Sequence, residues 1–270
     1  MPTLLELGPE EDLPPVWTRL RVEAAAAAAQ EPILASYLHA SLLNHDNFAR
    51  ALAYHLANRL GGEDMNAMQV REVCRDALEA DPSIVDRAEA DILAVFERDP
   101  ACRSFIQPFF YLKGYKALQA YRIAHWVLGE GRETLALHLH ARISTLFGVD
   151  IHPNAEIGKG VMIDHATSVV IGETAVLGDD CSLLHEVTLG GTGASVSDRH
   201  PKVGRGVLIG AGAKVLGNIS IGDEVRIAAG SVVLKDVPAH CTGAGVPAKP
   251  VGGKCAQPAR SMDQSIEFMI

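Results

Sequence analysis

Hydrophobic and polar positions follow two different periods along the chain. Up to about residue 147 the apolar residues recur at helical spacing, most clearly in the segment DPSIVDRAEADILAVFERDPAC over residues 81–102. Asp81-Pro82 gives a helix-start signal, and Asp99-Pro100 repeats it. One face of the predicted helix carries Ile84, Ala88, Ile92 and Val95. An alanine- and leucine-rich stretch over residues 21–45 predicts a packed helix pair before it.

From Ile151 onward an aliphatic residue recurs every six positions within each block, often followed by glycine. This hexapeptide period predicts a left-handed parallel β-helix, whose three short faces form a triangular coil of about 18 residues. We expect helices to cap one open end and a trimer to cover the flanks. The inward positions are Ile151, Ile157, Ile163, Ile171, Leu177, Leu183, Leu189, Val203, Ile209, Val215, Ile221, Ile227 and Val233.

The predicted fold class is therefore α + β, with helices first and a β-helix second. We divide the chain into an α-helical domain over residues 1–147, a β-helix catalytic domain over 148–253 and a flexible C-terminal tail over 254–270. The helical domain is expected to support oligomerisation and to contribute to the site.

Two interruptions break the period of six. Two extra residues separate Ile163 from Ile171, and the excursion GGTGASVSDRH separates Leu189 from Val203. Loops on a rigid scaffold are where binding and chemistry concentrate. Each interruption carries a histidine beside a charged residue, as Asp164-His165 and Arg199-His200.

The first candidate constellation joins Asp150 to His165. Asp150 lies 15 residues before His165, three short of one coil, which predicts contact on one face of adjacent coils. A carboxylate on one imidazole nitrogen makes the other a better general base. The alternative is a corner aspartate that satisfies turn amides beside an exposed histidine.

The other candidates have alternatives too. The guanidinium of Arg199, with His200, could bind a small carboxylate, or both could be solvated on a loop. Asp99 could cap a helix or face the site. Three histidines on predicted helices are expected to be structural: His125, His138 and His140. His152 and His185 leave open a zinc site built from histidines of neighbouring chains.

Composition and charge exclude several classes of function. The net charge is -9 with a pI near 5.6, which argues against binding nucleic acid or anionic lipid. Apolar runs do not reach the roughly 18 residues of a membrane span, and no export signal is visible. Five widely spaced cysteines without a CxxC pair disfavour a disulfide framework or a cysteine zinc site. We expect a cytoplasmic protein.

The motifs resemble one enzyme family. The stretches DIHPNAEIGKGVMIDHATSVVIGETAVLGDD, VTLGGTG, DRHPKVGRGVLIGAGAKVLGN and AGVPAKPVGG, with RDPAC and YLKGYKALQAYRIAHW upstream, are similar to serine O-acetyltransferases over residues 80–253. The combination of DHATS, GGTG and DRHP after a helical region is specific to this family. The chain has Ser168 where the family usually has glycine.

The resemblance implies transfer of acetyl from acetyl-CoA, as co-substrate, to the hydroxyl of L-serine, the first step of cysteine biosynthesis, with no metal. It implies His165 as the base and Asp150 as the carboxylate that orients it. It also implies substrate contacts, with Asp99 and Asp164 around the amine and Arg199 and His200 around the carboxylate. Finally, it implies a coenzyme A groove along Gly191, Ala211 and Ala229.

The same resemblance implies partners. They are L-cysteine as a feedback inhibitor, further copies in a homotrimer or dimer of trimers, and O-acetylserine sulfhydrylase, which would bind the C-terminal Ile270 with Phe268 and Met269 as further anchors.

Three other functions remain as alternatives from the sequence. One is acetyl transfer to another hydroxyl, on a sugar, an antibiotic or homoserine. Another is a zinc β-helix protein similar to carbonic anhydrase. The third is a non-catalytic scaffold that docks partners through its tail.

Overall fold

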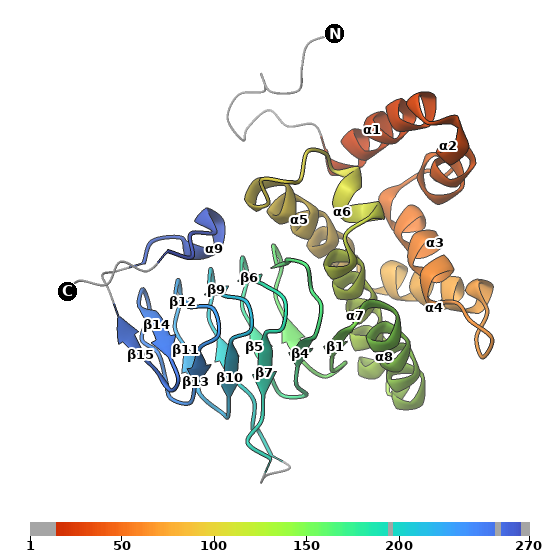
Figure 1. Ribbon diagram of the computed structural model, residues 1–270. Helices are drawn as coiled ribbons and strands as arrows, with labels where there is room; N and C mark the ends of the chain where they lie inside the picture. The colour runs from red at the N-terminus through yellow and green to blue at the C-terminus, as the bar shows by residue number, and fades with distance from the viewer. Residues whose placement is uncertain (1–14, 194–196, 252–254, 266–270) are drawn as a thin grey trace.

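The computed structural model describes residues 15–193, 197–251 and 255–265. Helices fill the first half of the chain, and short strands stacked in parallel fill the second (Figure 1). The helices are α1 Val16–Gln30, α2 Pro32–Leu38, the π-helix η3 His39–Leu43, α3 Phe48–Leu60, α4 Ala67–Ala80, α5 Ser83–Arg98, α6 Ile106–Phe110, α7 Lys113–Gly129, α8 Glu133–Phe147 and α9 Pro258–Ser261.

The start signals for helices give one correct and one wrong prediction. Helix α5 begins after Asp81-Pro82, where Oδ1 of Asp81 accepts a hydrogen bond from the N–H of Ser83 at 3.0 Å. Asp99-Pro100, however, follows the end of this helix, and α6 begins only at Ile106. Oδ1 of Asp99 accepts from the N–H of Ala101 at 2.8 Å, so the side chain stabilises a turn.

The strands form three parallel faces, since each coil contributes one strand to each face in turn. Sheet A contains β1 Val149–Ile151, β4 Val169–Ile171, β7 Thr188–Gly190, β10 Lys214–Leu216 and β13 Val232–Val233. Sheet B contains β2 Glu156–Ile157, β5 Val176–Leu177, β8 Lys202–Val203 and β11 Ser220–Ile221. Sheet C contains β3 Met162–Ile163, β6 Ser182–Leu183, β9 Leu208–Ile209, β12 Arg226–Ile227, β14 Thr242–Gly245 and the antiparallel β15 Ala248–Val251.

Strand pairing confirms the period and locates the interruptions. Ile171 pairs with Leu189, 18 residues later, and Val215 pairs with Val233 at the same interval. Ile151, in contrast, pairs with Ile171 at an interval of 20, and Leu189 pairs with Val215 at 26. The first coil therefore contains the two extra residues, and a later coil contains the long excursion. The predicted fold class, helices followed by a parallel β-helix, is confirmed.

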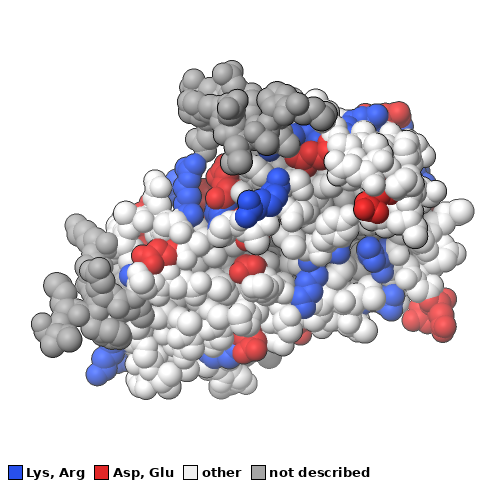
Figure 2. Space-filling view, turned by 45° about the horizontal axis from the view of Figure 1, so that its top comes forward, with Lys and Arg blue, Asp and Glu red and all other residues white. Residues whose placement is uncertain are grey.

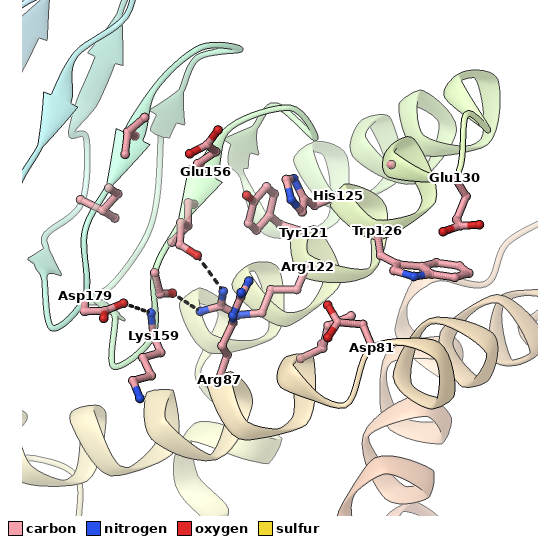
Figure 3. Close-up of a pocket in the computed structure, with 16 residues that line it drawn as sticks. Asp81, Arg87, Tyr121, Arg122, His125, Trp126, Glu130, Glu156, Lys159 and Asp179 are labelled. Carbon is pink, nitrogen blue, oxygen red and sulfur yellow. Dashed lines mark hydrogen bonds between the residues drawn. The ribbon is translucent and has the colours of Figure 1, made fainter.

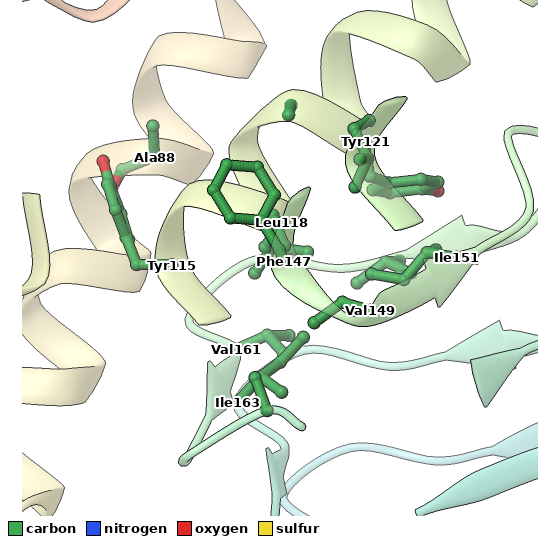
Figure 4. Packing of buried hydrophobic residues seen from close by; sticks show 14 of the residues in the cluster. Ala88, Tyr115, Leu118, Tyr121, Phe147, Val149, Ile151, Val161 and Ile163 are labelled. Atoms are coloured by element: carbon green, nitrogen blue, oxygen red, sulfur yellow. The ribbon is translucent and has the colours of Figure 1, made fainter. Parts of the chain in front are cut away.

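The inward positions form one core that continues into the helices. All thirteen predicted inward residues are at most 6% exposed. At the first coil, Leu118 of α7 and Phe147 of α8 belong to the same cluster as Val149, Ile151 and Ile163 (Figure 4). The expected helical cap at one end of the coil is therefore present, and it supplies the apolar cover that an open prism end lacks.

A buried ion pair also joins the helices to the coil. Asp91 on α5 is 0% exposed, and its Oδ2 lies 2.8 Å from Nη2 of Arg122 and accepts from Nε2 of Gln119 at 2.9 Å. Its Oδ1 accepts from the backbone N–H of Val161 at 2.8 Å. Arg122 in turn donates to the carbonyl oxygen of Ile157 at 3.1 Å. The carboxylate thus holds α7 and the first coil together.

Part of the predicted tail is folded. In α9 both Pro258 and Ala259 are buried, and Oγ of Ser182 donates to the carbonyl oxygen of Ala259 at 2.9 Å. The expectation of a flexible tail is therefore wrong for this part, because α9 packs against α5 and β9. Ile270 and its two neighbours lie outside the described residues. The division into three domains stays a prediction.

The surface has no dominant charge on the face shown in Figure 2, where acidic and basic side chains alternate. Within the described ranges, no helix combines the length and the apolar character needed to cross a bilayer.

Candidate functional site

The two extra residues form an irregular turn between β3 and β4. His165, Ala166 and Ser168 have positive φ angles of 55°, 61° and 61°. Such angles cost on the order of 1–3 kcal/mol each for residues other than glycine and cluster at functional sites. The chain therefore leaves the regular wall at this turn, as the break in period predicts.

Local contacts hold the turn in place. The N–H of Ser168 donates to the carbonyl oxygen of Gly148 at 2.8 Å, and the N–H of Asp164 donates to that of Leu183 at 2.8 Å. Ala166 is 0% exposed, so its methyl group anchors the turn in the core. The turn is therefore a rigid mount for the residue beside Ala166.

That residue, His165, has an exposed imidazole. Its side chain is 73% exposed, and its Nε2 lies 3.6 Å from Oδ2 of Asp164, too far for a hydrogen bond. The ring of His185 meets it edge-on at 5.7 Å, and among the described residues Nδ1 of His185 has no hydrogen-bond partner. Histidine at position 165 can therefore accept a proton from a molecule that approaches from solvent.

Helix α7 and the end of α5 lie beside this turn. Nζ of Lys113 donates to the hydroxyl oxygen of Thr167 at 2.6 Å. A Cβ on Gly114 would lie 2.1 Å from the carbonyl oxygen of Ile163, so only glycine lets α7 start this close to β3. Cys102, three residues after Asp99, packs against Met162 of β3. Asp99 is therefore on the same side of the coil as Asp164.

The edge where sheet C passes into sheet A, here the C–A edge, continues this turn along the coil. The N–H of Glu186 donates to the carbonyl oxygen of Thr167, that of Gly212 to His185, and that of Gly230 to Ala211, at 2.7–3.0 Å. Ala211 and Ala229 thus lie on successive coils of the edge that carries His165. Small side chains there leave the edge open to a long ligand.

Arg199 and His200 lie on another edge, where sheet A passes into sheet B, here the A–B edge. Nη2 of Arg199 lies 2.6 Å from Oε2 of Glu173, and this contact lowers the pKa of Glu173. The backbone N–H groups of both Arg199 and His200 donate to Oγ1 of Thr174, at 3.1 and 3.2 Å. The end of the long excursion is therefore fixed on the second coil.

The contacts of His200 assign its tautomer. The backbone N–H of Thr174 donates to Nδ1 of His200 at 3.2 Å, so Nδ1 accepts and a neutral ring carries its proton on Nε2. Burial, and secondly the charge of Arg199, lower the pKa of His200, which favours this neutral form. A Cβ on Gly172 would lie 2.0 Å from Nε2 of His200, and one on Gly191 would lie 3.3 Å from it. Both glycines therefore make room for the imidazole.

Asp150 has a different partner from the predicted one. Its Oδ1 lies 2.7 Å from Nε2 of His140 on α8, and this hydrogen bond is the largest cause that lowers the pKa of Asp150. His152 faces His140 with ring centroids 5.7 Å apart, and burial lowers the pKa of His152. His140, set aside as structural, is therefore part of this cluster.

The predicted contact of Asp150 with His165 within one chain is not formed among the described residues. The prediction assumed an 18-residue coil, whereas the first coil has 20 residues and Asp150 pairs with Val170. His165 is therefore five positions before the residue beside Asp150, on the C–A edge. Asp150 lies on sheet A near the A–B edge, and the other predicted site residues divide between the same two edges.

A cavity of about 710 Å³ lies elsewhere, between α5, α7 and the strands β2 and β5. Its wall includes Arg87, Tyr121, Trp126 and Lys159 (Figure 3), together with four acidic residues. None of the predicted site residues lines it. In the part of the chain that the structure describes, no three His, Cys, Asp or Glu side chains are grouped as metal ligands would be.

Sequence reasoning missed His140, Glu173 and Thr174. Glu173 and Thr174 stand in a glycine turn of the repeat IGETAV, where polar residues are ordinary, so only the fold reveals that they hold Arg199 and His200. His140 lies ten residues before Asp150, and that spacing crosses from a helix into a strand.

Comparison with known proteins gives the same result from two directions. The family profile "Serine acetyltransferase, N-terminal" matches residues 16–120, and "Bacterial transferase hexapeptide (six repeats)" matches residues 200–235. The serine acetyltransferase of Salmonella typhimurium is 53% identical over 257 residues, which cover 95% of this chain and 94% of the relative.

Solved structures agree in fold. A serine acetyltransferase in complex with cysteine is 50% identical with a TM-score of 0.92, covering 93% of this chain and 98% of that chain. The serine acetyltransferase of Brucella abortus in complex with coenzyme A is 48% identical with a TM-score of 0.87, covering 90% and 98%.

Proposed function

The chain belongs to the serine acetyltransferase family, and from this premise we propose that it moves the acetyl group of acetyl-CoA onto the hydroxyl of L-serine, a step toward cysteine in the cytoplasm. The observation that carries the proposal is the exposed imidazole of His165, mounted on a rigid irregular turn at the head of an open edge. The products are O-acetyl-L-serine and coenzyme A.

His165 acts first as a base and then as an acid. The serine hydroxyl is a weak nucleophile, so its proton passes to the imidazole as its oxygen attacks the thioester carbonyl carbon. When the tetrahedral intermediate breaks its C–S bond, the same proton returns to the departing thiolate. Positioned proton transfer of this kind contributes about 10²- to 10⁴-fold.

The charged groups suit an amino acid substrate. The guanidinium of Arg199 is already oriented by Glu173, and the N–H at Nε2 of His200 adds a second donor for the serine carboxylate. Asp99 and Asp164, on the other side of the coil, supply negative charge for the ammonium group. The two clusters together recognise a zwitterion.

The clusters lie on different edges of sheet A, so we infer that they meet across two chains. In a ring of three, the A–B edge of one chain faces the C–A edge of the next, which brings Asp150, Arg199 and His200 toward His165 of the neighbouring copy. Such an interface is heterologous and closes by rotation. A trimer, alone or paired as a dimer of trimers, follows from this arrangement.

Acetyl-CoA would lie in the groove between the copies, along Ala211 and Ala229 of one edge and Gly191 of the other. The bound coenzyme A in the Brucella abortus relative supports this co-substrate. L-cysteine carries a thiol where serine carries a hydroxyl, so it fits the same contacts as an inhibitor, and the cysteine complex of the other relative supports this. O-acetylserine sulfhydrylase remains the proposed partner for Ile270.

A thiol-release assay tests the proposal. Wild-type protein should release coenzyme A from acetyl-CoA only with L-serine, and homoserine or sugars should support far slower release. His165→Ala should lower kcat by about 10²- to 10⁴-fold, whereas His138→Ala should retain wild-type activity. Equal activity of His165→Ala and wild type would refute the assigned base.

A mixing experiment tests the shared site. His165→Ala and Asp150→Asn each remove one side of it, so either protein alone should be nearly inactive. Mixed trimers formed by refolding the two together contain sites with both intact residues, and their activity should recover to a fraction of wild type. No recovery in verified mixed trimers would place the whole site in one chain.

A further inference from the structure

The hydrogen bond between His140 and Asp150 has no assigned role in the proposed reaction. Nε2 of His140 lies 2.7 Å from Oδ1 of Asp150, within the range of a charge-assisted hydrogen bond. His140 is on α8, which packs along β1, so the contact joins the helical cap to the first strand of the coil. The His140 side chain is 20% exposed and that of Asp150 is 47% exposed.

The geometry leaves one side of the carboxylate open. An ionised carboxylate has two oxygens with about four acceptor sites, and among the described residues Oδ2 of Asp150 has no hydrogen-bond partner. The exposure of Asp150 shows that this oxygen is within reach of another molecule. His140 therefore fixes the carboxylate through one oxygen and leaves the other free.

The donor in this hydrogen bond is His140 whatever its charge. An ionised carboxylate only accepts, so Nε2 of His140 carries a proton in both the neutral and the charged ring. His152, on the same strand, is the other histidine that faces the pair, and Glu173 and Arg199 lie beyond it on the A–B edge. The contact thus persists across the protonation states of His140.

We propose that His140 is a positioning residue, which holds Oδ1 of Asp150 so that Oδ2 faces the imidazole of His165 from a neighbouring copy. This inference rests on the proposed function of Asp150 and His165. A carboxylate held on one side by a donor is fixed in rotation about its side-chain bonds, as residues that orient a metal or catalytic ligand are. His140 itself touches neither substrate.

Three substitutions at position 140 separate positioning from mere packing. His140→Leu fills the space without a donor, and His140→Asn has a donor but is too short to reach. His140→Gln has an N–H group at the distance of Nε2. We expect His140→Leu and His140→Asn to lower kcat by about 10-fold, with little change in either KM, and His140→Gln to recover most of the loss.

A double variant tests whether His140 acts through Asp150. Asp150→Asn should lower kcat by about 10²- to 10⁴-fold, and adding His140→Leu should lower it no further. His138→Leu, two residues away on α8, is the matched control and should retain wild-type kcat. Thermal unfolding and gel filtration of every variant establish that it is folded and assembled.

The outcomes distinguish the two proposals. If Asp150→Asn retains wild-type kcat, the proposed role of Asp150 fails, and the inference fails with it. If Asp150→Asn is impaired but the Leu and Asn variants at position 140 are not, only the inference is overturned. Effects that multiply in the double variant would mean that His140 acts independently of Asp150, which also overturns it.

Discussion

Nζ of Lys113 lies 2.6 Å from the hydroxyl oxygen of Thr167, so the first residue of α7 is tied to the turn that carries His165. Lys113→Met should loosen this turn and lower kcat by up to about 10-fold, because a misplacement of 1 Å can cost even more. The free energy of unfolding should change by only about 1 kcal/mol. Steady-state assays check this against Lys113→Arg, which keeps the donor, and Lys235→Met, on an exposed site. A kcat equal to wild type would show that the tie is dispensable.

Gly172 makes room for the imidazole of His200, since a Cβ there would lie 2.0 Å from Nε2. Gly172→Ala should therefore displace His200, raise the KM for serine more than that for acetyl-CoA, and lower the free energy of unfolding by about 1–3 kcal/mol. The matched control is Gly129→Ala at the end of α7, where a Cβ would meet nothing within 4 Å. Similar KM values for both variants would contradict the close packing.

The buried imidazole of His55 predicts a loss of stability in acid. Burial lowers the pKa of His55 to about 3, and among the described residues its Nε2 has no hydrogen-bond partner. The unfolded chain binds a proton below about pH 6.5 that the folded chain does not, so the free energy of unfolding should fall by up to about 1.4 kcal/mol per pH unit from there toward pH 3.

Replacing His55 isolates this contribution. His55 stacks on Phe109 with ring centroids 4.9 Å apart, so His55→Phe keeps an aromatic ring while it removes the titration. Urea titrations between pH 7 and pH 4.5, at a fixed protein concentration, should give a shallower pH dependence for the variant. Parallel curves for both proteins would mean that His55 binds its proton in the folded state.

Asp91 should be among the most sensitive positions in the chain. Asp91→Ala leaves Arg122 buried and without its counter-ion, which should lower the free energy of unfolding by about 3–5 kcal/mol. Asp86→Ala, on the exposed side of α5, should cost at most about 1 kcal/mol. Urea unfolding measures both. A loss below 1 kcal/mol for Asp91→Ala would mean that water reaches the Arg122 guanidinium.

The β-helix could be predicted from the sequence because its signal is local. Each coil repeats the same backbone path, so one aliphatic residue in six must point inward, and every such residue from Ile151 to Val233 is buried. The break after Ile163 was visible for the same reason: a regular pattern makes an insertion of two residues easy to find. Asp164 and His165 followed directly from it.

The partner of Asp150 could not be predicted in this way. Its contact with His140 depends on how α8 packs against β1, and no period in the sequence encodes the rotation of a helix relative to a strand. The expected contact with His165 was an error of arithmetic on the coil length, since the inserted residues lie between the two positions. Asp99-Pro100 was misread because an aspartate stabilises a turn as readily as it starts a helix.

The backbone hydrogen bonds along the C–A edge make that edge a ruler. From His165 through His185 and Ala211 to Ala229 there are three steps, each set at about 4.8 Å by strand spacing, so the span is roughly 14 Å whatever side chains occupy it. Substitutions can change what the edge binds, but only inserting or deleting a whole coil can change the length of molecule that it measures.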